Sequence, residues 1–197
     1  MLYGIYEHKI IKSLDIFPKE LCIMLAGEDL RADAAKLASV VSWVLLFPQI
    51  ERLIFHISTE HPKEVEAMIP LTEASARASV TLSTPDGEKK YGSGKLNMLI
   101  VIGKSGRREI TEAIAKIAKE NIPADEITEE TIEKHLLYQV SPDFVIKTGG
   151  NHLTDFLIWQ SVYSELFFTD INWKNFRRVD FLRALRDYQS RNRRFGK

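Results

Sequence analysis

Short apolar runs alternate with stretches of helical pattern along this chain, and that alternation constrains its fold more than any other feature. These β-branched or apolar runs lie at Leu21–Leu25, Leu53–Ile57, Val80–Leu82, Leu96–Ile102 and Phe144–Ile146. Strands that alternate with helices usually form a largely parallel sheet with helices packed on its faces. The sequence therefore predicts an α/β fold with a mostly parallel central sheet flanked by helices.

The length and composition of the chain favour one domain. It has 197 residues, of which 45% are hydrophobic. This is enough to bury one substantial core and too little to suggest two. We therefore expect residues 1–197 to form a single domain.

Two segments between the strands have clear local signals. In the stretch from Arg108 to Lys119, Ile110 and Ile114 recur at helical spacing, so we expect a helix that covers one face of the sheet. The segment Thr84–Gly94 contains Pro, Asp-Gly and two further glycines, and these residues predict a loop.

Charge, cysteine content and hydropathy exclude several classes of function. Lys and Arg together number 27, as do Asp and Glu, so the global charge predicts no nucleic-acid partner. Cys22 is the only cysteine, which excludes an intrachain disulfide and suits a reducing cytosol. The longest apolar stretch, Val40–Phe47, is far shorter than the roughly 20 residues that span a bilayer. We expect a cytoplasmic protein with at most peripheral contact with a membrane surface.

The C-terminal third carries a specific succession of motifs. From Pro142 onward there follow a PD-apolar strand, a T-G-G turn, an FL-WQ segment, a YSEL-F-TD-W-F stretch, a D-LRALRDYQ helix and a final R-R-F-G. This order closely resembles the C-terminal block of cis-prenyltransferases, which include undecaprenyl and dehydrodolichyl diphosphate synthases. Weaker similarities lie upstream, at Gly27, Ser58-Thr59-Glu60 and Gly106-Arg107. The resemblance implies the cis-prenyltransferase fold.

The resemblance also implies a chemistry. In that family a magnesium ion, held by an aspartate at the end of the first strand, helps to ionise an allylic diphosphate, and isopentenyl diphosphate condenses onto the resulting cation. A departing diphosphate needs a hard cation and preorganised donors at a site that excludes water.

This chain departs from the family at the residues that carry that chemistry. When the glycine of the family motif D-G-N-R-R is aligned on Gly27, Ala26 replaces the aspartate, and Asp29 and Leu30 replace the two basic residues. Further differences are that His61 replaces an asparagine, Lys147 an arginine and Asn151 a glutamate. The resulting degenerate family site consists of Ala26, Gly27, His61, Lys147 and Asn151. We expect a site that repels a diphosphate and holds no metal of its own.

The segment that helps to form the family's product tunnel is also short here, between Glu64 and Lys95. Less room is then expected for a long product chain.

Loss of the catalytic residues beside an intact C-terminal third is similar to the Nogo-B receptor type of subunit. The chain ends in Arg194-Phe195-Gly196-Lys197, and that subunit ends in Arg-Leu-Gly-Lys. The similarity implies a non-catalytic accessory subunit of a heteromeric enzyme that makes long-chain polyprenyl diphosphate. Its partner would be a catalytic paralogue that holds the magnesium ion.

Particular residues acquire roles from this resemblance. We expect residues 177–197 to form a C-terminal helix and a tail that reaches toward the partner. Arg194, Phe195 and Gly196 would complete the site where the partner binds isopentenyl and allylic diphosphates, and Glu165 would contribute to the magnesium shell. An aromatic cluster is expected to form core and dimer interface; it comprises Trp159, Tyr163, Phe167, Phe168 and Trp173, with Phe176 beside them.

Two other functions remain open from the sequence. The first alternative is a homodimeric cis-prenyltransferase that is active on its own through different residues. The second is a phosphate-binding or regulatory α/β domain without prenyl chemistry, since fold does not dictate function.

Overall fold

The computed structural model describes residues 2–103, 105–150 and 157–191. The helices are α1 (Leu2–Ser13), α2 (Gly27–Asp33), α3 (Lys36–Val44), α4 (Pro62–Met68), α5 (Leu71–Ser75), α6 (Gly106–Lys119), α7 (Glu129–His135) and α8 (Arg178–Ser190). The strands are β1 (Glu20–Ala26), β2 (Arg52–Ser58), β3 (Ala78–Thr84), β4 (Gly87–Tyr91), β5 (Leu96–Ile102), β6 (Phe144–Thr148) and β7 (Glu165–Thr169). Two short 3-10 turns are η1 (Ala124–Glu126) and η2 (Trp173–Asn175).

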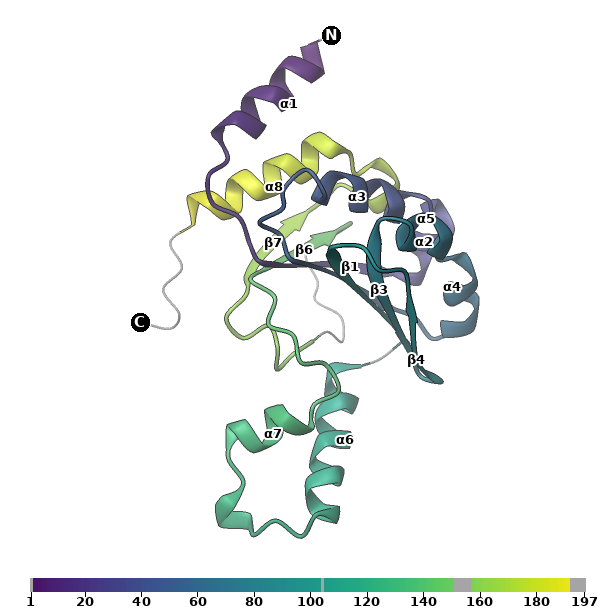
Figure 1. The fold of residues 1–197 in the computed structure, drawn as a ribbon, viewed down its shortest axis with the longest axis vertical. Helices are drawn as coiled ribbons and strands as arrows, with labels where there is room; N and C mark the ends of the chain where they lie inside the picture. Colours follow the sequence, from purple (N-terminus) through teal and green to yellow (C-terminus); the bar gives the residue numbers. More distant parts are fainter. Residues whose placement is uncertain (1, 104, 151–156, 192–197) are drawn as a thin grey trace.

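The strands form one seven-stranded sheet in the order β4-β3-β5-β2-β1-β6-β7. All neighbouring pairs are parallel except the β3–β4 hairpin. Figure 1 shows α3 and α8 above one face of this sheet. The predicted α/β class, with its mostly parallel sheet and flanking helices, is confirmed.

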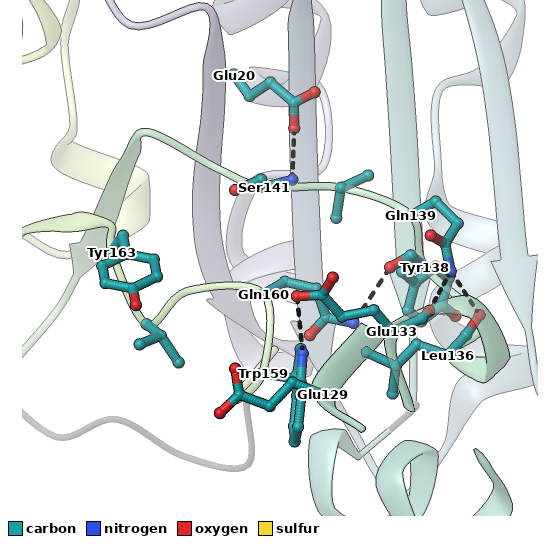
Figure 2. Close-up of a pocket in the computed structure, with 12 residues that line it drawn as sticks. Glu20, Glu129, Glu133, Leu136, Tyr138, Gln139, Ser141, Trp159, Gln160 and Tyr163 are labelled. Carbon is teal, nitrogen blue, oxygen red and sulfur yellow. Dashed lines mark hydrogen bonds between the residues drawn. The ribbon is translucent and has the colours of Figure 1, made fainter. Parts of the chain in front are cut away.

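Loop residues cover the second face of the sheet. Cys22, Met24 and Ile54 are buried there, beneath Tyr138 and Leu157. Figure 2 shows Tyr138 beside Gln160, whose amide nitrogen donates a hydrogen bond to the Tyr138 carbonyl oxygen. Among the described residues, Tyr138 and Leu157 therefore cover this part of the second face.

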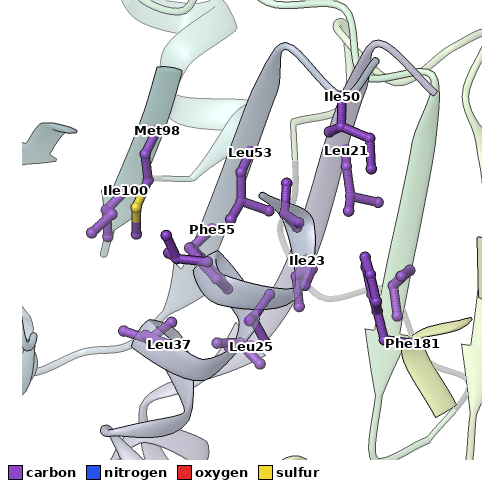
Figure 3. Close-up of a cluster of buried hydrophobic side chains, with 14 of the residues drawn as sticks. Leu21, Ile23, Leu25, Leu37, Ile50, Leu53, Phe55, Met98, Ile100 and Phe181 are labelled. Carbon is purple, nitrogen blue, oxygen red and sulfur yellow. The ribbon is translucent and has the colours of Figure 1, made fainter. Parts of the chain in front are cut away.

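The larger core lies on the first face, where alternate residues of β1 and β2 point toward α3 and α8. Leu21, Ile23 and Phe55 are fully buried in it, together with Phe181 from α8 (Figure 3). Burying such a side chain stabilises the fold by about 1.5–3 kcal/mol. The period-two geometry of β1 and β2 therefore places alternate residues of each strand in two separate buried clusters, one on each face.

Two local expectations are wrong. The segment Thr84–Gly94 is not only a loop, because it contains strand β4, which pairs with β3. The side chains of β4 are polar and mostly exposed, so the strand has no apolar pattern in the sequence. The helix at 108–119 is present as α6, but it packs chiefly against α7 and projects away from the sheet (Figure 1). Ile114 is accordingly 53% exposed.

Among the described residues, no helix is both long and apolar enough to cross a bilayer.

His135 joins the C-terminal ends of α6 and α7. Its Nδ1 lies 2.6 Å from the carbonyl oxygen of Thr131, and its Nε2 lies 3.0 Å from a carboxylate oxygen of Glu120. Both neighbours are acceptors and favour the protonated ring, so the Thr131 carbonyl, and next the Glu120 carboxylate, raise the pKa of His135.

The raised pKa gives a prediction with a definite sign. The protonated His135 ring stabilises the folded chain. This contribution to the free energy of unfolding is complete below the unfolded-state pKa of about 6.5 and is lost as the pH rises through the folded-state pKa. We expect the thermal midpoint of the wild-type chain to fall over that interval relative to His135→Gln, which lacks the titration. Parallel melting profiles of the two proteins from pH 5 upward would contradict this assignment.

Candidate functional site

The carboxyl ends of four neighbouring parallel strands meet at one edge of the sheet. β1 ends at Ala26, β2 at Ser58, β5 at Ile102 and β6 at Thr148, and Ala26 pairs directly with Ser58. In open α/β sheets, ligands bind in the crevice outside the carboxyl ends of the strands. This edge is therefore the candidate functional site.

A pocket of about 450 Å³ lies at this edge, over β1, β2 and β5. It is lined by Glu28, Ser58, Thr59, Glu60, His61, Gly103 and Ser105. Three segments build it: the start of α2, the turn after β2 and the turn that leads into α6.

Close packing at the rim of the pocket requires glycine at two positions. A Cβ at Gly27 would lie 2.9 Å from the Thr59 Oγ1 and 3.3 Å from a methyl carbon of Val65. Gly103 has a φ of +64°, which favours glycine, and a Cβ there would lie 3.0 Å from Pro62. The two glycines let α2 and the turn before α6 approach the turn after β2.

Asp29 caps the helix that begins at this edge. Its Oδ2 accepts a hydrogen bond of 2.8 Å from the backbone N–H of Ala26. Burial raises the pKa of Asp29, and the Ala26 hydrogen bond and the nearby charge of Lys147 offset part of that rise. One carboxylate oxygen of Asp29 is thereby committed to the backbone of its own chain.

The nearest arginine on α2 is also committed to carboxylates. Arg31 contacts Glu64 at 2.6 Å and Glu28 at 3.3 Å. Glu28 and Glu60 line the pocket, and its described lining residues include no lysine or arginine. The described lining therefore presents two carboxylates to any diphosphate that enters, and like charges at close range are electrostatically unfavourable.

The end of β1 offers no side-chain ligand for a magnesium ion. Ala26 ends β1 with a methyl group, which offers no oxygen ligand. In the described parts of the chain, no three His, Cys, Asp or Glu side chains are close enough to share a metal ion.

The structure brings together most of the residues predicted for the degenerate site. Ala26 and Gly27 lie at the junction of β1 and α2, His61 lines the pocket, and Lys147 is near the end of β6. The Lys147 Nζ donates a hydrogen bond to the carbonyl oxygen of Thr148. Asn151 lies outside the described residues.

The residues predicted to act on a partner lie elsewhere. Glu165 begins β7 at the amino edge of the sheet, opposite the pocket, and it pairs with Arg191 at 3.2 Å. Arg194, Phe195 and Gly196 lie outside the described residues. The in-trans roles of these four residues stay predictions.

The predicted aromatic cluster divides into buried and exposed members. Trp173 and Phe176 are 0% exposed, so Trp173 belongs to the core of this chain and its assignment to a dimer interface is corrected. The physical reason is that its ring packs against Phe55 and stacks on Phe176. Tyr163 and Phe168 are 64% and 39% exposed, whereas Trp159 and Phe167 are half-buried. The dimer interface itself stays a prediction.

Sequence reasoning missed a buried polar network behind α6. The Glu109 carboxylate accepts hydrogen bonds from the Tyr138 N–H at 2.9 Å and from the Gln160 Nε2 at 3.0 Å. Glu109 stands one turn before Ala113 on the buried side of α6. An acidic residue at a helical position that is otherwise apolar was the sequence feature that could have indicated a buried carboxylate. This carboxylate fixes α6 against the loop segments that cover the second face of the sheet.

Comparison with known proteins places this geometry in a family. Residues 57–196 match the family model described as "Putative undecaprenyl diphosphate synthase". The chain is 49% identical over 118 residues to the tritrans,polycis-undecaprenyl-diphosphate synthase (geranylgeranyl-diphosphate specific) of Methanocaldococcus jannaschii, a match that covers 55% of this chain and 41% of that protein. The chain thus matches less than half the length of that relative.

Another relative matches from end to end. The short-chain Z-isoprenyl diphosphate synthase of Mycobacterium leprae is 37% identical over 251 residues, covering 100% of this chain and 96% of that protein. Among solved structures, lavandulyl diphosphate synthase from Lavandula x intermedia, in complex with dimethylallyl diphosphate, superposes with a TM-score of 0.68. It has 19% sequence identity, and the superposition covers 92% of this chain and 99% of that one, so it shows a shared fold. The chain belongs to the cis-prenyltransferase family.

Proposed function

We propose that this chain is a non-catalytic subunit of a heteromeric cis-prenyltransferase. The complex would make long-chain polyprenyl diphosphate from isopentenyl diphosphate and an allylic diphosphate. The observation that carries the proposal is the carboxyl edge of the sheet, where a methyl group ends β1 and the described lining residues supply carboxylates without a lysine or arginine.

The electrostatics of that edge explain why catalysis would need a partner. Ionisation of an allylic diphosphate places negative charge on the departing group, which must be met by a cation or by preorganised donors. Glu28 and Glu60 line the pocket at that edge, and Arg31 is held by Glu64. A catalytic paralogue would supply the magnesium site and the binding site for both diphosphates.

A second candidate is a prenyltransferase that is active on its own. The names of the relatives favour this candidate, since the proteins of M. jannaschii and M. leprae are both named as synthases. It requires residues other than Ala26 to promote the departure of the diphosphate.

One assay separates the two candidates. We expect the purified chain alone, given magnesium, an allylic diphosphate and labelled isopentenyl diphosphate, to incorporate no label above background. The same chain co-purified with a family member that keeps D-G-N-R-R should incorporate label into long products. Ala26→Asp serves as a control and should stay inactive alone, because Glu28 and Glu60 remain. Elongation by the partner-free chain would establish the second candidate instead.

A further inference from the structure

A second cavity lies away from the carboxyl edge, on the side of the sheet where β1 begins. It has a volume of about 670 Å³ and is enclosed by α7, the segment 136–141 and the turn at 159–163 (Figure 2). Glu20 at the start of β1 marks its position near the amino edge. It is therefore separate from the pocket assigned to the family's chemistry.

The charged side chains that line this cavity are all acidic among the described residues. Glu129 and Glu133 lie one turn apart on α7, and both line it. In the described structure the Glu129 side chain has no ion-pair or hydrogen-bond partner, and the Glu133 carboxylate accepts one hydrogen bond, of 3.3 Å, from the Trp159 indole N–H. Glu20 is already paired with Arg52 at 2.6 Å. The described lining residues include no lysine, arginine or histidine.

A buried amide oxygen gives the second, independent observation. Gln160 lines the cavity and is 8% exposed. Its Nε2 faces both carboxylate oxygens of Glu109, at 3.0 Å each, and the Tyr138 carbonyl oxygen at 3.3 Å, so three acceptors fix the orientation of the amide. The Oε1 has no hydrogen-bond partner among the described residues. An unpaired buried acceptor is unfavourable and is satisfied by an N–H donor.

Aromatic faces complete the lining. The Trp159 ring lies beside Glu133 in Figure 2, and Tyr163, which is 64% exposed, borders the same cavity. Aromatic faces attract cations, and Trp does so most strongly. We propose that this cavity binds an organic cation that carries N–H donors, either a primary ammonium or a guanidinium group. Glu129 and Glu133 would meet its charge, Trp159 its face and the Gln160 oxygen one N–H.

The test is a titration of the whole chain observed through the Trp159 indole N–H signal in a nitrogen-15 spectrum, assigned with Trp159→Phe. The probes are putrescine and N-acetyl-argininamide, with sodium chloride at equal ionic strength as the salt control. We expect saturable shifts of the Trp159 signal with at least one probe. The double variant Glu129→Gln, Glu133→Gln should weaken binding about tenfold or more, because charge-assisted hydrogen bonds are lost.

Glu130→Gln is the matched control, because Glu130 lies on the same helix but pairs with Lys134 and does not line the cavity. It should bind within about twofold of the wild type, since exposed ion pairs contribute little. Tighter binding of the diamine would identify a free polyamine as the source of the cation, and tighter binding of N-acetyl-argininamide would identify a protein side chain. The absence of saturable shifts with both probes, or equal weakening by Glu130→Gln, would overturn the proposal.

Discussion

Deletion of residues 194–197 from the proposed heteromer is expected to lower its turnover by about tenfold to a thousandfold and to leave the subunits assembled. The reason is that a guanidinium bound to a diphosphate oxygen makes charge-assisted hydrogen bonds worth about 1.5–3 kcal/mol each. Arg194 and the backbone of Gly196 would supply such donors to the partner's site. The tail carries one large apolar residue, Phe195, so it adds little buried area to an interface.

Arg191, the last described residue, lies at the amino edge of the sheet. Arg191 is held at the amino end of β7 by Glu165 at 3.2 Å and by the Leu166 carbonyl oxygen at 2.9 Å. Its own helix adds Asp187 at 2.6 Å. The chain therefore leaves the described fold on the side of the sheet opposite the pocket that contains Glu28 and Glu60.

Size-exclusion chromatography beside steady-state kinetics with isopentenyl diphosphate would measure the effect of the deletion. Arg194→Lys should show an intermediate loss, because it keeps the charge but not the planar fork. Arg193→Ala is the matched control, since it removes a neighbouring charge outside the Arg-Phe-Gly motif. Unchanged kcat and KM in an intact complex would refute the role of the tail.

The strands of this fold were predictable because five of them are buried apolar runs. β5 occupies Leu96–Ile102, the range of its apolar run. β4 was not predictable in this way, because Glu88, Lys89 and Lys90 are exposed and the strand is held by its backbone ladder to β3. The apolar spacing of α6 also could not predict which element the helix packs against. Its apolar spacing predicts a buried side, but whether that side meets the sheet or α7 depends on tertiary packing.

The location of the candidate site was predictable from the sequence, but the contacts that set its charge were not. The end of an apolar run places Ala26 at the edge of the sheet, and the parallel order of strands then gathers the residues after β2 and β5 beside it. The contacts that decide the charge of the pocket were not predictable. Asp29 caps its own helix through a local contact, whereas the pairing of Arg31 with Glu64 depends on how α2 and α4 pack.

The core position of Trp173 gives the largest expected effect on stability. Trp173→Ala should lower the free energy of unfolding of the lone chain by about 3–5 kcal/mol, the usual cost of truncating a buried aromatic residue. Its ring meets Phe55 at a centroid distance of 6.3 Å and stacks on Phe176, also at 6.3 Å. Its indole N–H also donates a 2.8 Å hydrogen bond to the carbonyl oxygen of Asp33, the last residue of α2.

Urea denaturation of three variants would separate the contributions of Trp173. Trp173→Phe keeps much of the packing and loses the indole N–H, so a smaller loss is expected, of which the hydrogen bond accounts for about 0.5–1.5 kcal/mol. Tyr163→Ala is the exposed control and should change the stability of the lone chain by about 0.5 kcal/mol or less. If Trp173→Ala left the unfolding free energy unchanged and impaired only assembly with a partner, Trp173 would belong to an interface. A loss of stability in the lone chain would instead show that Trp173 links η2 to the end of α2. Since α2 begins directly after Ala26, the same contact would help to hold the carboxyl edge of the sheet.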